Sequence, residues 1–195
     1  MYREGEFSLP GTKILYGSCY GTAKRYAEAL AKAAGFDCHP YTEAAEAADC
    51  DRLVYVGGLY AGGIHGLSKA LHALHPNRER RYCIVTVGLA DPKDTQNVQN
   101  IRASMEKRLP REVMEKAEIF HLRGGIDYAR LNFTHKTMMA LLYNSVKRKP
   151  PESLDADARA MLETYGKKVD FVDLATLQPI LHALRPDLNK LDNGR

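Results

Sequence analysis

Residues 13–23 read Lys-Ile-Leu-Tyr-Gly-Ser-Cys-Tyr-Gly-Thr-Ala, and they contain the clearest local indication of the fold. Lys13–Tyr16 is a short apolar strand that ends at a glycine. Beyond the loop, apolar side chains repeat at helical spacing as far as Ala34. Gly35 then stands where a helix commonly takes its C-terminal cap. The sequence therefore predicts a strand, a glycine-containing loop and an amphipathic helix in that order.

The same unit recurs further along the chain. Arg52–Val56 and Tyr82–Val87 are apolar runs that suit strands buried on both faces of a parallel sheet, and each run is followed by glycine. Strands that alternate with helices indicate an α/β fold with a doubly wound parallel five-stranded sheet and helices on both faces. The predicted strands are 13–16, 36–41, 52–56, 82–87 and 118–122, with a brief further strand at 169–172. The predicted helices are 26–34, 67–74, 98–109, 158–165 and 177–184, and 42–50 is a short helix or a loop.

Length and composition favour one domain over residues 1–195. The chain is 45% hydrophobic and 27% charged, and it is long enough to build a core without disulfides. A net charge of +4 without basic-aromatic interleaving does not indicate nucleic acid binding. The four cysteines lack Cys-x-x-Cys or zinc spacing, which predicts reduced thiols, no metal site and a cytoplasmic location. No apolar run has the length of a signal peptide or of a membrane span.

Residues 126–151 break the strand–helix rhythm, and we interpret them as a late insertion. From Arg123 to Lys149 there are six basic residues and one acidic residue, alongside several leucines and methionines. Such a basic, apolar helix suits peripheral contact with an anionic membrane surface through residues 126–149, at the inner membrane face, or docking of a redox partner. The alternative is that its apolar side packs on the core and its charges face water.

The loop between the first strand and the first helix is the strongest functional signal. A helix N-terminus presents unpaired N–H groups and a positive dipole end, and small residues let a phosphate approach them. The loop has no lysine and no Gly-x-Gly-x-x-Gly pattern, which excludes a Walker loop and a dinucleotide fingerprint. The alternative is an ordinary strand-to-helix turn. The predicted phosphate-binding residues are Ser18, Cys19, Tyr20, Gly21, Thr22 and Ala23.

Residues 18–23 resemble the Ser/Thr-x-Thr-Gly-x-Thr phosphate loop of flavodoxins. Ser18 and Gly21 match that pattern, whereas Tyr20 and Ala23 replace threonines, and Thr22 offers a hydroxyl one place early. The resemblance implies flavin mononucleotide (FMN) as the cofactor, the strand order 2-1-3-4-5, and a ring site between the loops after the third and fourth strands. Tyr60 would stack on the ring, and the alternative is an exposed loop tyrosine. The implied ring-site residues are Gly58, Leu59, Tyr60, Ala61, Gly62, Gly88, Leu89, Ala90 and Asp91.

Three further segments resemble small bacterial flavodoxin-domain proteins and the flavodoxin-like protoporphyrinogen oxidases that pass electrons to menaquinone. They are Gly57–His65, Gly124–Tyr128 and Tyr165–Asp173. The resemblance covers nearly the whole chain and implies an oxidoreductase or electron-transfer flavoprotein whose partner is a protein or a quinone. It leaves the substrate and the oligomeric state open.

Other functions were weighed against this one. A flavodoxin fold without flavin, acting as a binding or regulatory module, stays open because of Tyr20 and Ala23. A receiver domain is disfavoured because glycine and serine stand where its acidic residues should be. No second nucleotide site supports a nicotinamide-dependent reductase. His65 and His135 could move protons near a flavin, and Cys19 stands where a thiolate is favoured, but no motif places any of the three.

Overall fold

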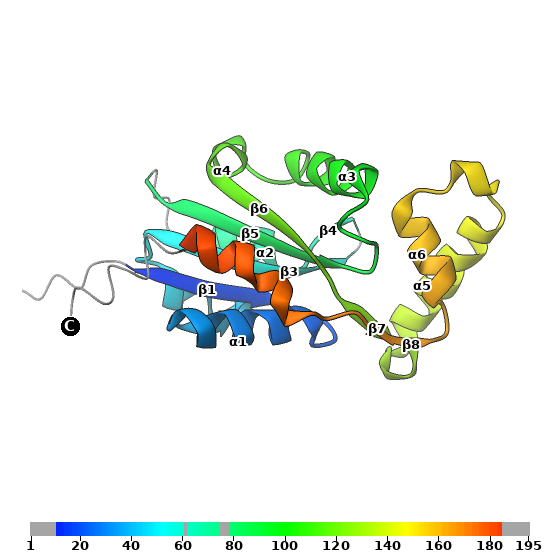
Figure 1. Ribbon diagram of the computed structural model, residues 1–195, viewed down its shortest axis with the longest axis horizontal. Helices are drawn as coiled ribbons and strands as arrows, with labels where there is room; N and C mark the ends of the chain where they lie inside the picture. The colour runs from blue at the N-terminus through cyan, green and yellow to red at the C-terminus, as the bar shows by residue number, and fades with distance from the viewer. Residues whose placement is uncertain (1–10, 61, 75–78, 185–195) are drawn as a thin grey trace, which may run out of the picture.

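The computed structural model describes residues 11–60, 62–74 and 79–184. Five parallel strands form a sheet in the order β2-β1-β3-β5-β6 (Figure 1). This confirms the predicted fold class and the predicted order 2-1-3-4-5, because the short β4 is not part of the parallel set and pairs antiparallel with β3. The strands are β1 (Thr12–Gly17), β2 (Cys38–Pro40), β3 (Arg52–Tyr60), β4 (Gly63–Ile64), β5 (Arg81–Gly88) and β6 (Ala117–Arg123).

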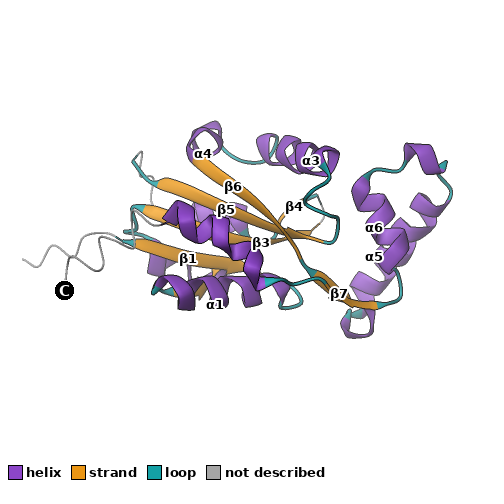
Figure 2. Cartoon of the chain, viewed as in Figure 1, coloured by secondary structure: helices purple, strands orange, loops and turns teal. Residues whose placement is uncertain are grey.

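Helices cover both faces of this sheet (Figure 2). Alternate residues of each central strand point to opposite faces, so that Val54 and Val56 join one hydrophobic core while Leu53 and Tyr55 join the other. The first core lies under α1 (Thr22–Ala34) and the final helical residues 178–184. The second lies under the 3-10 segment η1 (Tyr41–Ala47), α2 (Leu67–Ala73), α3 (Thr95–Glu106) and α4 (Arg111–Lys116).

The glycine at position 35 correctly predicted where the first helix ends. Helix α1 ends at Ala34, and Gly35 is its C-cap with a φ of 70°. The second strand is shorter than the predicted 36–41, because Phe36 leaves the ladder and its side chain is buried in the first core.

The prediction that the third strand stops at Gly57-Gly58 is wrong. Strand β3 continues to Tyr60 and there pairs with β4. A Cβ atom on Gly57 would lie 2.1 Å from Cγ2 of Ile64, so this glycine is needed for the close approach of β4 and does not end the strand.

The chain leaves the main sheet after β6 and returns before residue 171. The elements in between form a unit that we call the outer lobe, residues 125–170, at the right of Figure 1. It is closed by antiparallel pairing of β7 (Gly125–Asp127) with β8 (Lys168–Asp170), so the predicted strand 169–172 begins one residue earlier, ends at Asp170 and lies outside the parallel sheet. The lobe also contains η2 (Tyr128–Arg130), α5 (Phe133–Lys147), η3 (Pro151–Ser153) and α6 (Ala156–Thr164).

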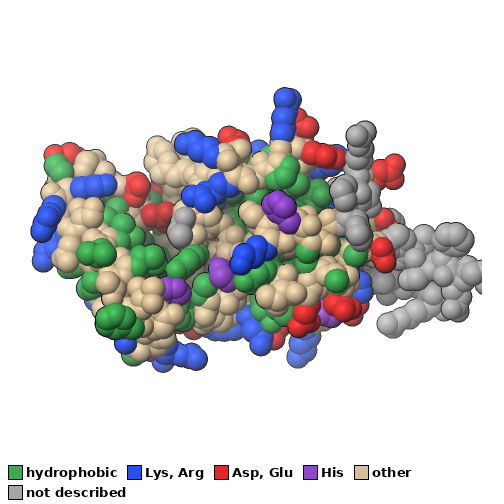
Figure 3. Space-filling view, turned by 180° about the vertical axis from the view of Figure 1, so that it is seen from behind, with side chains coloured by type: hydrophobic (Ala, Val, Ile, Leu, Met, Phe, Trp, Pro, Cys, Tyr) green, Lys and Arg blue, Asp and Glu red, His purple; other side chains and the backbone are tan. Residues whose placement is uncertain are grey.

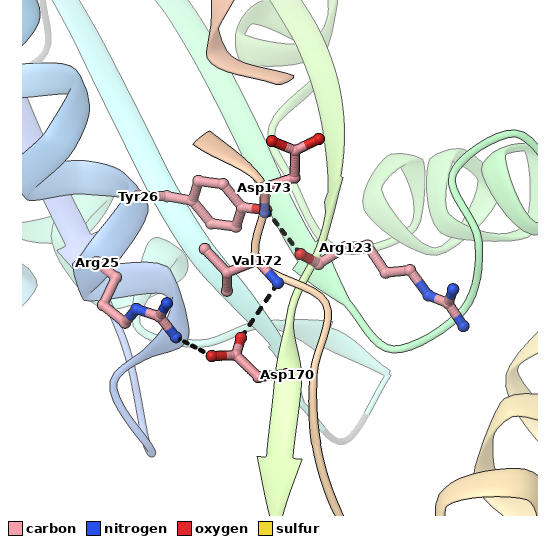
Figure 4. Close-up of polar contacts among 6 residues, drawn as sticks. All are labelled: Arg25, Tyr26, Arg123, Asp170, Val172 and Asp173. Atoms are coloured by element: carbon pink, nitrogen blue, oxygen red, sulfur yellow. Dashed lines mark hydrogen bonds and ion pairs between the residues drawn. The ribbon is translucent and has the colours of Figure 1, made fainter. Parts of the chain in front are cut away.

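Side chains of α1 bind both chain segments that connect the outer lobe to the sheet (Figure 4). The Tyr26 hydroxyl donates to the carbonyl of Arg123 at 2.8 Å and accepts from the amide of Asp173 at 2.9 Å. The Arg25 guanidinium pairs with the Asp170 carboxylate at 2.6 Å. The outgoing and returning chains are therefore both anchored next to the start of α1.

Candidate functional site

The predicted phosphate loop lies at the carboxyl end of β1, directly before α1. Gly21 adopts φ 94°, a left-handed conformation that glycine tolerates, and this turns the chain into the helix. The Gly21 amide donates to Ser18 Oγ at 2.9 Å. Among the described residues, none accepts from the amides of Thr22, Ala23 or Lys24. The first turn of α1 holds no acidic residue, so its positive dipole end is not neutralised locally.

The other side chains of this loop differ in what they can offer. Ser18 Oγ already accepts from the backbone, whereas the Thr22 hydroxyl has no hydrogen-bond partner among the described residues. Burial raises the pKa of the Cys19 thiol, which disfavours a thiolate there despite the nearby helix end. Burial likewise raises the pKa of Tyr20, which keeps its hydroxyl neutral.

Tyr20 and Tyr60 meet at a histidine from the outer lobe. His135 on α5 is hydrogen-bonded through Nδ1 to the Tyr20 hydroxyl and through Nε2 to the Tyr60 hydroxyl, the latter at 2.7 Å. The Tyr60 and His135 ring centroids are 5.2 Å apart, and His65 packs edge-on to Tyr60. The loop after β1 and the end of β3 thus place Tyr20 and Tyr60 next to the same histidine.

The loop after β5 lies beside this group. The Gly88 carbonyl accepts a hydrogen bond from the Gly124 amide at 2.7 Å. The Leu89 carbonyl accepts one from Arg123 Nε at 2.9 Å. Their carbonyls are therefore already engaged, and any polar contact to a ligand would come from backbone N–H groups. Ala90 is buried, and the Asp91 carbonyl accepts from Asn97 Nδ2 at 3.1 Å, which fixes the loop to α3.

A cavity of about 880 Å³ opens between this site and the outer lobe. Leu59, Tyr60, Gly88 and Leu89, all predicted ring-site residues, line one end of it. Its volume is within the usual range for small-molecule sites. The other walls come from β4 and the start of α2, and from α3, α5, α6 and their flanking residues. They are mostly apolar, with Arg108 and Lys149 as basic groups and Asp155 and Asp157 as acidic ones.

The predicted residues are thus brought together in two groups. The phosphate loop 18–23 surrounds the start of α1, and the residues after β3 and β5 border the cavity. Gly58 lies inside β3, and its carbonyl accepts from the His65 amide at 2.9 Å. Gly62 is held by α3, because its carbonyl accepts from the Ser104 hydroxyl and the Arg108 guanidinium lies beside it. Ala61 is outside the described residues.

Gly124 is a neighbour of the site that was not among the predicted site residues. A Cβ atom on Gly124 would lie 3.3 Å from Thr22 Oγ1 and 3.6 Å from the Gly88 carbonyl, so this glycine lies between the phosphate loop and the β5 loop. Its position shortly after the predicted strand 118–122, like the glycines after the other strands, was a sequence signal that it lies at this edge of the sheet. His135 was considered near a flavin without a motif to place it, and the structure shows that the first turn of α5 brings it to Tyr20 and Tyr60, a contact that no local pattern indicates.

Two histidines near the sheet predict a pH-dependent stability. Burial, as the largest cause, lowers the pKa of His65 and of His121 from 6.5, with nearby Lys69 and Arg102 adding to the effect. The folded protein therefore resists protonation that the unfolded chain accepts, so the free energy of unfolding should fall as the pH drops just below 6.5. Urea unfolding across this window measures the effect.

The matched variant for this prediction is His121→Asn, which removes one titrating group and should flatten the pH profile. Asp157 acts in the opposite direction, because desolvation raises its pKa from 3.8 and the folded protein then takes up this proton more readily than the unfolded chain. A wild-type stability that stays constant from neutral pH through the histidine range would contradict the prediction.

Comparisons with known proteins place the chain among flavodoxin-type sequences. No curated protein matches it. Similar solved structures include the Trp repressor binding protein from Bacillus subtilis, at 13% identity and a TM-score of 0.39 over 58% of this chain and 82% of that one. A mutant flavodoxin from Pseudomonas aeruginosa has 16% identity and a TM-score of 0.37 over 78% of this chain and 99% of that one. The family model of the flavodoxin domain matches residues 13–153, and the chain belongs to this flavodoxin domain family.

Proposed function

We propose that the chain binds FMN and carries electrons through it. One juxtaposition supports this proposal. Three amides at the start of α1 have no acceptor among the described residues, and the Tyr20–Tyr60 group lies close to them, next to the cavity. A phosphate ester needs the first feature, and a flat aromatic ring needs the second. The residues present therefore fit the cofactor, which supplies one- and two-electron transfer when bound.

Each part of the site has a defined task in this proposal. The amides of Thr22, Ala23 and Lys24 and the Thr22 hydroxyl would hold the phosphate without any lysine. Tyr60 would stack on the ring, and its hydroxyl bond to His135 fixes the tilt of that side chain. The apolar walls of the cavity exclude water from one side of the ring, which strengthens local electrostatic interactions.

The proposal is tested by titrating purified protein with FMN and with riboflavin, which lacks the phosphate. We expect quenching of flavin fluorescence with both ligands and clearly tighter binding of FMN. Equal affinities would count against the phosphate loop. Absence of binding to either flavin would favour the alternative of a flavin-free binding or regulatory module.

A narrower candidate is oxidation of protoporphyrinogen with a quinone as acceptor. The sequence resemblance of Gly57–His65 and Gly124–Tyr128 supports it, as does the mostly apolar lining of the cavity. Aerobic and anaerobic assays of the flavin-loaded protein with protoporphyrinogen and a menaquinone analogue test it. Turnover of an electron-carrier partner without porphyrinogen oxidation would favour simple electron transfer.

A further inference from the structure

Helix α5 carries an unusual number of exposed apolar side chains. Five large hydrophobic residues are exposed in the described chain, and four of them lie on α5: Phe133 is 85% exposed, Leu141 69%, Leu142 48% and Met138 36%. Phe133, Met138 and Leu141 fall on one side of the helix, and together with Leu142 they line a shallow groove that also contains Thr134 and Thr137. Exposed apolar groups gathered in this way mark an interaction surface.

The opposite face of α5 is already packed, so the exposed face cannot turn inward. Val146 is buried, Tyr143 stacks on Tyr165 of the lobe at 3.9 Å between ring centroids, and His135 is bonded to Tyr20 and Tyr60. The helix therefore packs with one side and leaves the other to solvent. Figure 1 shows α5 at the end of the molecule away from the sheet, and Figure 3 shows hydrophobic side chains gathered over the lobe.

The charged residues of α5 and of the segments directly flanking it have one sign. Residues 128–149 contain five basic residues and no aspartate or glutamate. None of the five forms a salt bridge with a described residue. The five are Arg130, Lys136, Lys147, Arg148 and Lys149.

We propose that the outer face of α5 docks on an anionic phospholipid bilayer, with the helix lying in the plane of the surface. Phe133, Met138 and Leu141 enter the boundary between headgroups and acyl chains, and the cluster 147–149 contacts lipid phosphates. No helix in the described ranges is long and apolar enough to cross a membrane, so docking is interfacial. An exposed, largely apolar helix side beside lysines and arginines that form no salt bridge with a described residue matches an anionic surface.

The test uses sedimentation of the full chain with vesicles of phosphatidylglycerol and phosphatidylcholine, and with vesicles of phosphatidylcholine alone. We expect binding to the anionic vesicles that weakens as salt is raised. The double variant Phe133→Ser/Leu141→Ser should bind at least about tenfold more weakly. The matched control is Leu174→Ser, which changes an apolar residue that is 51% exposed but lies on η4 (Leu174–Leu177), and it should bind as the wild type does.

Charge is tested in the same way. Lys147→Glu/Arg148→Glu should abolish the salt-sensitive binding, whereas Arg111→Glu, on exposed α4, should not. Flavin affinity is measured in parallel, and the docking proposal does not depend on it. Failure of the wild type to bind anionic vesicles at low salt overturns the proposal, as does equal binding to neutral vesicles. Binding only to an acidic protein would also overturn it.

Discussion

Thr22→Asp is expected to weaken FMN binding by about 100-fold while leaving riboflavin binding unchanged. The substitution puts a carboxylate in the first turn of α1, among the three amides that face the proposed phosphate. Two negative charges about 5 Å apart in a partly solvated site repel by roughly 3 kcal/mol, which gives this factor. The helix itself should be slightly stabilised, because acidic groups are favoured at helix N-termini. Fluorescence titration with both flavins measures the result.

The control is the same substitution at the first position of another helix. Thr95→Asp in α3 adds an equal charge in the first helical turn and should leave both affinities near those of the wild type. If Thr22→Asp weakened FMN and riboflavin equally, the loss would come from the ring site or from misfolding. If FMN still bound tightly, the phosphate would lie elsewhere.

Gly17→Ala is expected to destabilise the protein by about 3 kcal/mol or more. A Cβ atom at this position would lie 1.9 Å from the carbonyl oxygen of His65 and 2.6 Å from the Tyr55 hydroxyl. These two atoms are themselves hydrogen-bonded at 2.6 Å, and no side-chain rotation relieves a clash with backbone. The β3–β4 turn would have to move away from β1, carrying Tyr60 with it. We therefore expect weaker flavin binding as well.

Gly58→Ala is the matched control, because Gly58 also lies at the carboxyl end of the sheet. Its added Cβ would be 3.8 Å from the Gly17 carbonyl, which is ordinary contact. Urea unfolding should give a change below about 1 kcal/mol for this variant. Similar losses for both variants would mean that the crowding at Gly17 is relieved by a general shift of the strands.

The parallel sheet could be predicted because the sequence features that indicate it lie within each strand and in the turn that follows. Continuous apolar runs such as Arg52–Val56 indicate buried strands, and the glycines after them indicate turns at one edge of the sheet. The error at Gly57 has the same origin, since a glycine that ends a strand and a glycine that admits a neighbouring chain look alike in sequence. Only the position of Ile64 distinguishes them.

The contacts of the outer lobe could not be predicted in this way. The pairing of Ile126 with Val169 joins residues more than 40 positions apart, and neither three-residue strand shows enough alternation to reveal its partner. His135 is similar, because its two tyrosine contacts depend on how α5 is rotated against the site. The apolar pattern of α5 likewise did not show which of its residues would be buried.

The packing of residues 178–184 against α1 has a consequence for synthesis of the protein. Leu30 and Tyr26 of α1 share their core with Ile180 and Leu184, so a helix made early in the described chain packs on the same face of the sheet as the last described one. About 150 residues separate Ala34 from Leu184, which corresponds to roughly 8 to 30 s of translation. During that time one face of the nascent sheet remains uncovered. We therefore expect the growing chain to bind a chaperone on the α1 face until residues 178–184 have emerged and packed there.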